Sequence, residues 1–287
     1  GFALTGTLVT PDRIISSGTV VVSSGVIECA DRDCVVPRDY TIVVTTGLIF
    51  PGLVDAHNHY DWNVHGAWRH DGSTYTNRHQ WRLCDLFYVA FSSAHYGISI
   101  DTVTAHMMHH YGKALALLGG VTTIQGGYRN YGLGLARNPE SDHVFNSSLT
   151  IRSSIFPLND LDRSRPPAKP YLKELRPLVE AGPSRPRTRD HLDRFIVHMA
   201  EGVPGDVSYS EYEELMGVLS QYGHPQLPDD WLTIIHGLAL REKSLRAAHA
   251  RRAMLVWSPR SNEDLYGAGQ TLDVVNAREL GLGVALG

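Results

Sequence analysis

The chain has 287 residues, of which 43% are hydrophobic and 20% are charged, and its formal net charge at pH 7 is -4. This composition is typical of a globular protein that is long enough for a barrel and a small second domain. The charge balance provides no basic stripe for a nucleic acid, and no apolar run approaches the ~18 residues of a membrane span. We therefore expect neither a nucleic-acid partner nor a membrane segment.

The three cysteines, Cys29, Cys34 and Cys84, are too few for a disulfide framework. A Cys29–Cys34 disulfide is one alternative, but free thiols are the favoured interpretation. The first residues lack the basic start and apolar centre of a signal peptide. We expect a cytoplasmic protein, with a removed leader as the alternative because the chain does not begin with Met.

Residues 1–47 have the pattern of short strands. Residues 18–30 (GTVVVSSGVIECA) and 40–50 (YTIVVTTGLIF) are rich in Val, Ile and Thr, and glycine interrupts both. The pattern predicts a small β-structure before the main domain.

From residue 48 onward, apolar strand-like runs alternate with helical segments. The segment 96–120 has helical spacing and ends in Gly-Gly, and the buried run VTTIQGG (121–127) follows it. Further on, strand-like runs cover residues 231–240 and 253–262, with a helical pattern between them. Repeated strand–helix units predict parallel α/β architecture, and eight such units would close a barrel. We expect the Pro- and Arg-rich segment 163–190 to be a solvated connection.

Histidines and a glutamate follow several of these apolar runs. His57 and His59 follow the first run, His198 and Glu201 end a later one, and His236 ends the next. Residues i and i+2 of an extended strand point the same way, so both rings of the first pair can face the barrel axis. Neutral imidazoles that converge on one spot are natural metal ligands. A single His-x-His is a weak signal, but three separate strand ends that each carry a histidine together predict a metal site.

The same segments resemble the motifs of a known family. PGLVDAHNH (51–59) resembles the first-strand motif of the amidohydrolase superfamily of metal-dependent hydrolases, and LLGGVTTIQ (117–125) resembles its second-strand signature. VHMAEG (197–202) and IIHG (234–237) are similar to its fifth- and sixth-strand histidine motifs. WSPRSNEDLYG (257–267) resembles the seventh-strand segment of the cytosine deaminase and chlorohydrolase-like branch. The motifs occur in family order along nearly the whole chain.

The resemblance implies an α/β fold, a TIM-type (β/α)8 barrel in residues 48–287. Residues 1–47 would then form the N-terminal part of a small β-sandwich. The family also has an aspartate on its eighth strand, which is expected just beyond GLGVALG (281–287). We therefore expect a chain that is truncated near strand 8 and that lacks the C-terminal part of the barrel and of the sandwich.

The resemblance also implies roles for the strand-end residues. His57, His59 and His198 would ligate a metal ion. Glu201 would move a proton from the attacking water to the leaving group, and His236 would polarise the water or the substrate carbonyl. The expected cofactor is one divalent ion, zinc, with iron as the alternative.

A single ion is favoured over a pair. Binuclear relatives bridge their ions with a carboxylated lysine or a glutamate on the fourth strand, and the candidate strands between residues 121 and 160 contain neither. The nearby lysines, Lys169 and Lys173, lie in the Pro-rich connection.

The segment after the first histidine pair is rich in Trp, Tyr, Arg and His, which suits a planar or carboxylate-bearing substrate because arginine forks pair with carboxylates. The candidate substrate contacts are Trp62, Arg78, Trp81, Arg82 and Asn262. The alternative is that these aromatic side chains pack on the barrel rim. Three histidines at helical spacing are predicted to be surface or packing residues: His106, His109 and His110.

The leading hypothesis is a hydrolase that cleaves C–N bonds other than peptide bonds in a small molecule, by deaminating an amino-heterocycle or by hydrolysing a cyclic amide. One alternative is an amidase or dipeptidase-like enzyme that acts on N-acyl or peptide substrates. A non-catalytic assembly protein on the same scaffold is disfavoured because the three histidines are present. A deaminase of the Pro-Cys-x-x-Cys type is excluded because the sequence has no such pair. The resemblance also leaves a homo-oligomer possible, because members of the family are often dimers or larger assemblies.

Overall fold

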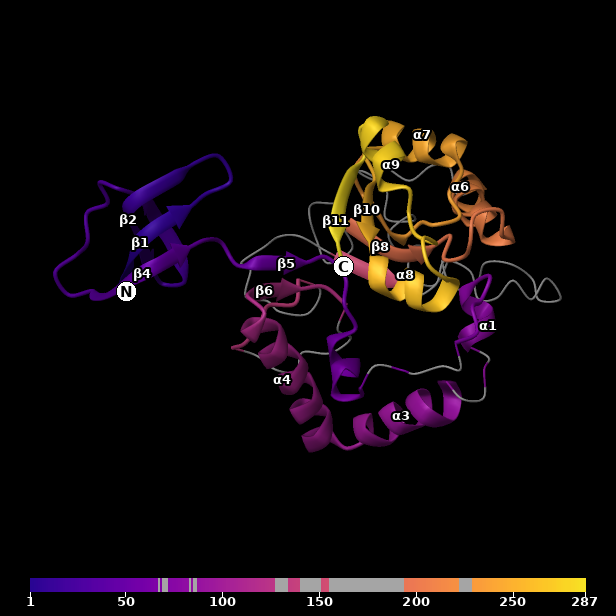
Figure 1. Cartoon of the computed structure of the whole chain (residues 1–287), viewed down its shortest axis with the longest axis horizontal. Helices are drawn as coiled ribbons and strands as arrows, with labels where there is room; N and C mark the ends of the chain where they lie inside the picture. The colour runs from indigo at the N-terminus through magenta and orange to yellow at the C-terminus, as the bar shows by residue number, and fades with distance from the viewer. Residues whose placement is uncertain are drawn as a thin grey trace. The chain divides into compact units, whose positions relative to one another are not determined.

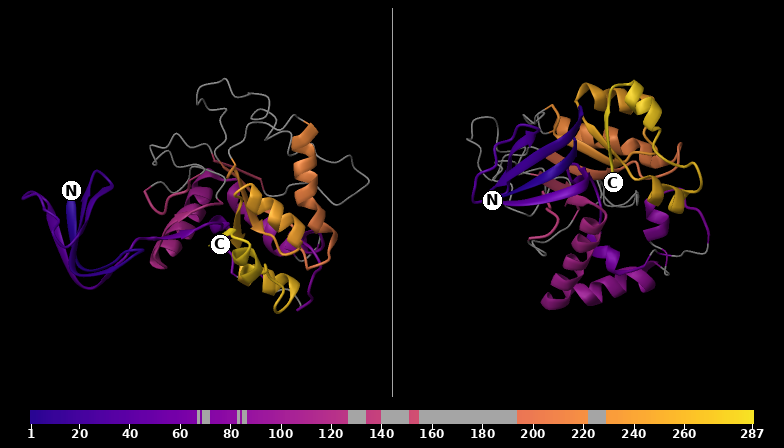
Figure 2. Two further views of the ribbon diagram at one scale, coloured as in Figure 1. Left: turned by 90° about the horizontal axis from the view of Figure 1, so that it is seen from above. Right: turned by 60° about the vertical axis from the view of Figure 1, so that its left-hand side comes forward.

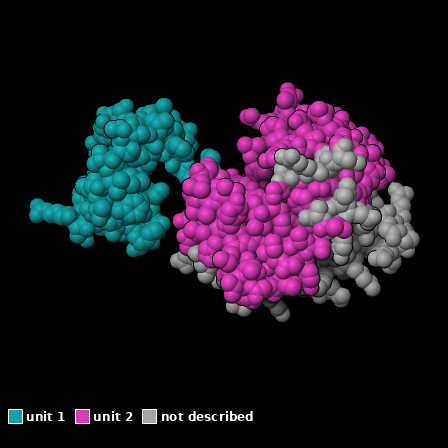
Figure 3. Space-filling view, turned by 60° about the horizontal axis from the view of Figure 1, so that its bottom comes forward, with its two compact units in different colours: residues 1–53 teal, residues 54–287 magenta. Residues whose placement is uncertain are grey.

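The computed structural model describes residues 1–66, 68, 72–82, 84, 87–126, 134–139, 151–154, 194–221 and 229–287. The chain divides into two compact units, Gly1–Leu53 and Val54–Gly287, which Figure 3 colours separately. The predicted connection at residues 163–190 lies outside the described residues. Within the described part of the chain, no helix is long and apolar enough to cross a bilayer.

The first unit contains one four-stranded sheet, with the strand order β3-β2-β1-β4. Its strands are β1 (Phe2–Val9), β2 (Ile14–Ser23), β3 (Val26–Asp31) and β4 (Thr41–Ile49). β1, β2 and β3 form an antiparallel meander, and β4 runs parallel to β1. Leu8, Ile15 and Val20 form its small apolar core. Residues 1–53, all of which are described, provide no second sheet for the predicted sandwich.

Strand β4 lies at one edge of this sheet and carries exposed apolar side chains. Ile42, Val44 and Leu48 are 53%, 76% and 64% exposed. Among the described residues, only β1 pairs with β4, so one row of its backbone N–H and C=O groups has no ladder partner there.

Cys29 and Cys34 are joined by a disulfide, so the prediction of free thiols at these two positions was wrong. β3 ends soon after Cys29, and the turn that follows brings the two Cα atoms to 5.8 Å, within the normal range for a disulfide. Cys84 is a free thiol.

The second unit alternates strands and helices along the chain (Figure 1). Its strands are β5 (Leu53–Asp55, which begins at the unit boundary), β6 (Val121–Ile124), β7 (Ile151–Ser154), β8 (Arg194–Met199), β9 (Leu232–His236), β10 (Met254–Trp257) and β11 (Gly283–Leu286). Its helices are η1 (Tyr60–Val64), α1 (Arg78–Arg82), η2 (Tyr88–Ser92), α3 (Ser93–Ser99), α4 (Thr102–Leu118), η3 (Val207–Ser210), α6 (Glu211–Gln221), α7 (Glu242–Ala250), α8 (Pro259–Tyr266) and α9 (Val274–Glu279).

The main sheet is parallel, with the order β11-β10-β9-β8-β7, and β5 and β6 form a separate pair. The two sets meet where the Ala56 N–H donates to the Leu286 carbonyl at 2.9 Å. On the far side of β6, Thr123 and Arg137 form a parallel bridge. Parallel α/β architecture is thereby confirmed. The described strands do not complete a closed ring, so the full barrel stays a prediction.

Helices α6, α7 and α9 cover one face of the main sheet (Figures 1 and 2). In β8, Phe195 and Val197 pack into the large apolar cluster with residues of these three helices. The alternate residue Ile196 packs on the opposite face with Ile235 and Val256. This alternation follows the two-residue period of a strand and places His198, at the end of β8, on the face away from the helices.

Helix α4 approaches the chain beside the histidine pair closely. A Cβ at Gly112 would overlap the carbonyl of Tyr60, so only glycine permits this approach. His109 is buried with its ring edge-on to Tyr60, whereas His110 is exposed. The prediction of packing and surface roles agrees with both placements, and α4 ends directly before the predicted Gly-Gly stop.

Candidate metal centre

Three histidines from two parts of the chain converge at strand ends. His57 follows β5, His59 directly precedes η1, and His198 is the penultimate residue of β8. The Nε2 atoms of His57 and His59 are 3.2 Å apart, and those of His59 and His198 are 3.3 Å apart. One ligand atom from each ring lies within 4.8 Å of the others.

The ring of His57 is oriented by Gln125, which follows β6. His57 Nδ1 donates to Gln125 Oε1 at 2.7 Å, and an amide oxygen can only accept. The lone pair of His57 is therefore on Nε2, which faces the other two rings. The backbone of Gln125 is fixed in turn, because its N–H donates to Asp55 O and its carbonyl accepts from Asn58 N.

Burial keeps these imidazoles neutral. It lowers the pKa of His57 and His198 well below the usual value for histidine, and the neighbouring rings lower both further. Burial also lowers the pKa of His59, although the Asp61 carboxylate opposes this shift. Metal ligation requires the neutral form of histidine, so the set is in the form that can bind.

The three residues fit a divalent ion. Two nitrogens that each lie ~2.05 Å from a tetrahedral zinc are about 3.3 Å apart, close to both Nε2–Nε2 separations. Two imidazole nitrogens that point their lone pairs at each other at this distance repel one another unless a cation or a proton lies between them. His59 Nδ1 is also buried without a hydrogen-bond partner among the described residues.

Two further predicted residues lie beside the histidines. Glu201 is 2% exposed and follows β8, and His236 ends β9. His236 Nε2 lies 3.7 Å from Glu201 Oε1, and its ring centroid is 5.4 Å from that of His198. Strict alternation would place His236 with Ile234 on the helix-covered face. A left-handed backbone at His236 (φ 71°) breaks the alternation, and its ring meets that of His198 on the other face.

Asn262, a candidate substrate contact, is in contact with other protein side chains in the structure. It is fully buried, and its Oδ1 accepts from His236 Nδ1 at 2.8 Å. Its Nδ2 faces Thr271 Oγ1 at 3.3 Å. Both ends of the amide are thus engaged by protein groups, and Asn262 fixes the orientation of His236.

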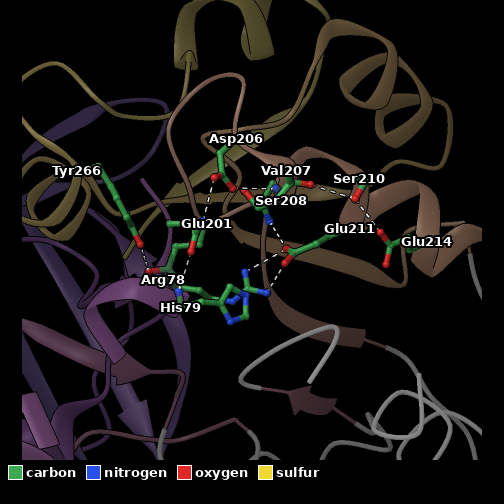
Figure 4. A network of polar contacts seen from close by, with 12 residues as sticks. Arg78, His79, Glu201, Asp206, Val207, Ser208, Ser210, Glu211, Glu214 and Tyr266 are labelled. Atoms are coloured by element: carbon green, nitrogen blue, oxygen red, sulfur yellow. Dashed lines mark hydrogen bonds and ion pairs between the residues drawn. The ribbon is translucent and has the colours of Figure 1, made fainter. Parts of the chain in front are cut away.

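Arg78 was also a candidate substrate contact, and its structural position is different. It forms a completely buried ion pair with Glu211, with Nη1 3.1 Å from Oε2 and Nη2 bonded to Oε1 (Figure 4). Glu211 Oε2 also accepts from Ala200 N at 2.7 Å, and Arg78 N donates to the carbonyl of Glu201 at 3.1 Å. The pair holds the turn after β8, and a substrate role for Arg78 stays a prediction.

Of the other candidate substrate contacts, Trp62 lies in η1, and Trp81 and Arg82 are neighbours in α1. Trp62 stacks on His95 with ring centroids 3.9 Å apart, as expected for rim packing. Trp81 donates from Nε1 to Tyr266 OH at 3.1 Å. Arg82 is exposed at the end of α1.

Three residues that contact the site were not among the predicted site residues: Gln125, Glu211 and Tyr266. Gln125 could have been found, because it is a polar residue directly after an apolar strand, as the histidines are. Glu211 and Tyr266 lie on helices and carry no comparable signal.

Solved structures share this fold. Zinc-complexed atrazine chlorohydrolase TrzN from Arthrobacter aurescens TC1 matches 100% of this chain and 71% of its own, at 12% identity and a TM-score of 0.67. E. coli guanine deaminase matches 100% of this chain and 74% of its own, at 17% identity and a TM-score of 0.60. Guanine deaminase from C. acetobutylicum, with bound guanine, matches 100% and 74%, at 12% identity and a TM-score of 0.55.

These enzymes belong to the amidohydrolase superfamily, and the chain shares their fold. No protein-family model matches the sequence, and no curated sequence does.

Proposed function

We propose that this chain is a metal-dependent hydrolase of the amidohydrolase superfamily that cleaves C–N bonds other than peptide bonds. Its reaction is the deamination of an amino-heterocycle or the hydrolysis of a cyclic amide. One observation carries the proposal: the Nε2 atoms of His57, His59 and His198 converge beside Glu201 and His236. The fold is shared with two guanine deaminases and a chlorohydrolase, enzymes named for heterocyclic substrates.

His57, His59 and His198 would hold one divalent ion, zinc, the ion named for the chlorohydrolase complex. Bound there, such an ion lowers the pKa of water from 15.7 towards ~7. β7, the fourth strand of the proposed barrel, has the sequence IRSS and carries neither Lys nor Glu to bridge a second ion.

Glu201 would act as general base and then as general acid. It takes a proton from the water whose oxygen attacks an sp² carbon, and it returns this proton to the nitrogen that leaves when the C–N bond breaks. His236 would stabilise the negative charge that develops on the substrate. Its Nδ1–H donates to Asn262 Oδ1, so Nε2 is the ring atom that faces the reaction, and it would stabilise this charge in the imidazolium form, with a proton on Nε2 as well.

The finer architecture is also proposed. Residues 48–287 would form a (β/α)8 barrel, and residues 1–47 would form part of a small β-sandwich. The support is the continuous strand order from β6 through β5 and β11 to β7, together with the fold shared with amidohydrolase structures.

The test is a metal analysis followed by a substrate screen. We expect one zinc per chain, which the His57→Ala and His198→Ala variants lose and the His110→Ala variant retains, because His110 is an exposed histidine on α4. The zinc-loaded protein should release ammonia from amino-heterocycles or open cyclic amides. Two ions per site would refute the single-ion proposal. Hydrolysis of N-acyl or dipeptide substrates alone would favour the amidase alternative.

A further inference from the structure

Three segments that are distant in sequence form a chain of hydrogen bonds that ends at the carboxylate of Glu201. Tyr266, the last residue of α8, donates from its hydroxyl to Glu201 Oε1 at 2.8 Å (Figure 4). Trp81, from α1, donates to the same hydroxyl oxygen at 3.1 Å. Tyr266 is 3% exposed and Glu201 is 2% exposed, so these contacts are shielded from water.

The direction of this chain of hydrogen bonds is fixed by chemistry. An indole N–H can only donate, so Trp81 engages a lone pair of the Tyr266 oxygen. The single phenolic proton of Tyr266 must then point to Glu201, which accepts it as a carboxylate. Burial, and next the charge of Glu201, raise the pKa of Tyr266 above its usual value. The phenol therefore keeps its proton and serves as a fixed donor.

The backbone around Tyr266 is anchored as well. Tyr75 N donates to the carbonyl of Leu265 at 2.8 Å, which ties the end of α8 to the segment before α1. The helix stops at Gly267, whose left-handed backbone (φ 103°) is unfavourable for any other residue. The hydroxyl of Tyr266 is thus held by its own helix end as well as by Trp81.

The two oxygens of Glu201 differ as a result. Oε1 accepts from Tyr266 and lies 3.7 Å from His236 Nε2. Among the described residues, no hydrogen bond to Oε2 is found. The terminal torsion of a glutamate is soft and roughly two-fold, so a bond to one oxygen selects which oxygen faces the reaction.

We propose that Tyr266, itself fixed by Trp81, is a positioning residue that holds Glu201 by Oε1 and leaves Oε2 to carry the proton. This inference rests on the hydrolysis proposed above, because it assigns the shuttled proton to one atom.

The kinetic test uses full-length, zinc-loaded protein and a substrate from the screen. Tyr266→Phe should keep its zinc and change KM by less than about threefold. It should lose about 10- to 100-fold in kcat, because a misplaced catalytic group costs rate more than binding. In a Glu201→Gln background, the same change should alter the rate by less than about threefold. Tyr212→Phe, at an equally buried tyrosine in the apolar cluster of α6, is the matched control and should behave as wild type.

A second readout does not need turnover. The chain has five tryptophans, and the indole N–H signal that disappears in Trp81→Phe identifies Trp81 in a nitrogen-15 correlation spectrum. This signal should move in Tyr266→Phe and also in Glu201→Gln, because the three groups form one polarised chain. If Tyr266→Phe fails to fold, Trp81→Phe should show the same kinetic pattern with a smaller loss.

Three results would overturn the inference. The first is a kcat of Tyr266→Phe within threefold of wild type, and the second is an equal loss of rate in the wild-type and Glu201→Gln backgrounds. The third is a Trp81 indole signal that does not move in Tyr266→Phe. A zinc-loaded protein that hydrolyses no substrate of either class overturns the proposed function instead. The Trp81 signal then still decides whether the contact with Glu201 exists.

Discussion

Removing one partner of the buried ion pair between Arg78 and Glu211 should strongly destabilise the fold. The perturbation is Glu211→Leu, which removes the carboxylate and keeps a similar volume. It removes the carboxylate that pairs with the buried guanidinium of Arg78 and that accepts from the N–H of Ala200.

The expected loss follows from these contacts. Breaking a buried pair by removing one partner costs about 3–5 kcal/mol, and an unsatisfied buried N–H adds about 1–3 kcal/mol. The two costs overlap, so we expect the free energy of unfolding to fall by about 4 kcal/mol. This is a large part of the ~5–15 kcal/mol that stabilises a typical domain. Arg78→Met combined with Glu211→Leu removes both charges, so the double variant should be more stable than Glu211→Leu alone.

The assay is urea unfolding of the zinc-loaded variants, analysed as a double-mutant cycle. We expect a coupling of at least about 2 kcal/mol between Arg78 and Glu211. Glu242→Gln is the matched control, since it breaks an exposed i,i+4 pair with Arg246 and should cost less than about 0.5 kcal/mol. If the two single losses at Arg78 and Glu211 simply add, or if Glu211→Leu costs no more than the control, the reasoning is refuted.

Three further predictions concern the metal centre. Glu201→Gln should retain its zinc and lose at least ~100-fold in rate, because it can no longer shuttle a proton; near-normal turnover would refute its role. Gln125→Leu should weaken zinc affinity by about 10- to 100-fold, measured by competition with a chelating dye, because His57 Nδ1 loses its acceptor; an unchanged affinity would contradict the assigned orientation. In chelated protein, the free energy of unfolding should fall as the pH drops below about 6.5. Burial lowers the folded-state pKa of His57 and His198, so the unfolded chain binds more protons in that range; a flat profile in pH-dependent melts would count against this.

The strand-end residues could be predicted from sequence because their positions depend on local pattern. Parallel strands bring their carboxyl ends to one edge of the sheet, and an apolar run precedes each of these residues: His57, His59, His198, Glu201 and His236. The left-handed turn at His236 was not foreseeable, because nothing in the local pattern sets a positive φ at a histidine.

The partners of buried polar side chains could not be predicted in the same way. Arg78 meets Glu211 across 133 positions, and Asn262 meets His236 across 26. A polar residue in a rim segment looks the same in sequence whether it faces a substrate or another side chain. The protein partners of Arg78 and Asn262 therefore became visible only in the folded structure.

The exposed edge at β4 bears on how the protein behaves in solution. Unpaired backbone groups beside exposed Val44 and Leu48 form a template on which another strand can add, the usual origin of edge-to-edge aggregation. Self-association of the purified chain would therefore be attributed first to strand addition at this edge, and only then to a native oligomer. A Val44→Lys variant places a charge on the edge and distinguishes these two forms of self-association. Edge-to-edge association should disappear in the variant, whereas a dimer that forms through another surface should persist.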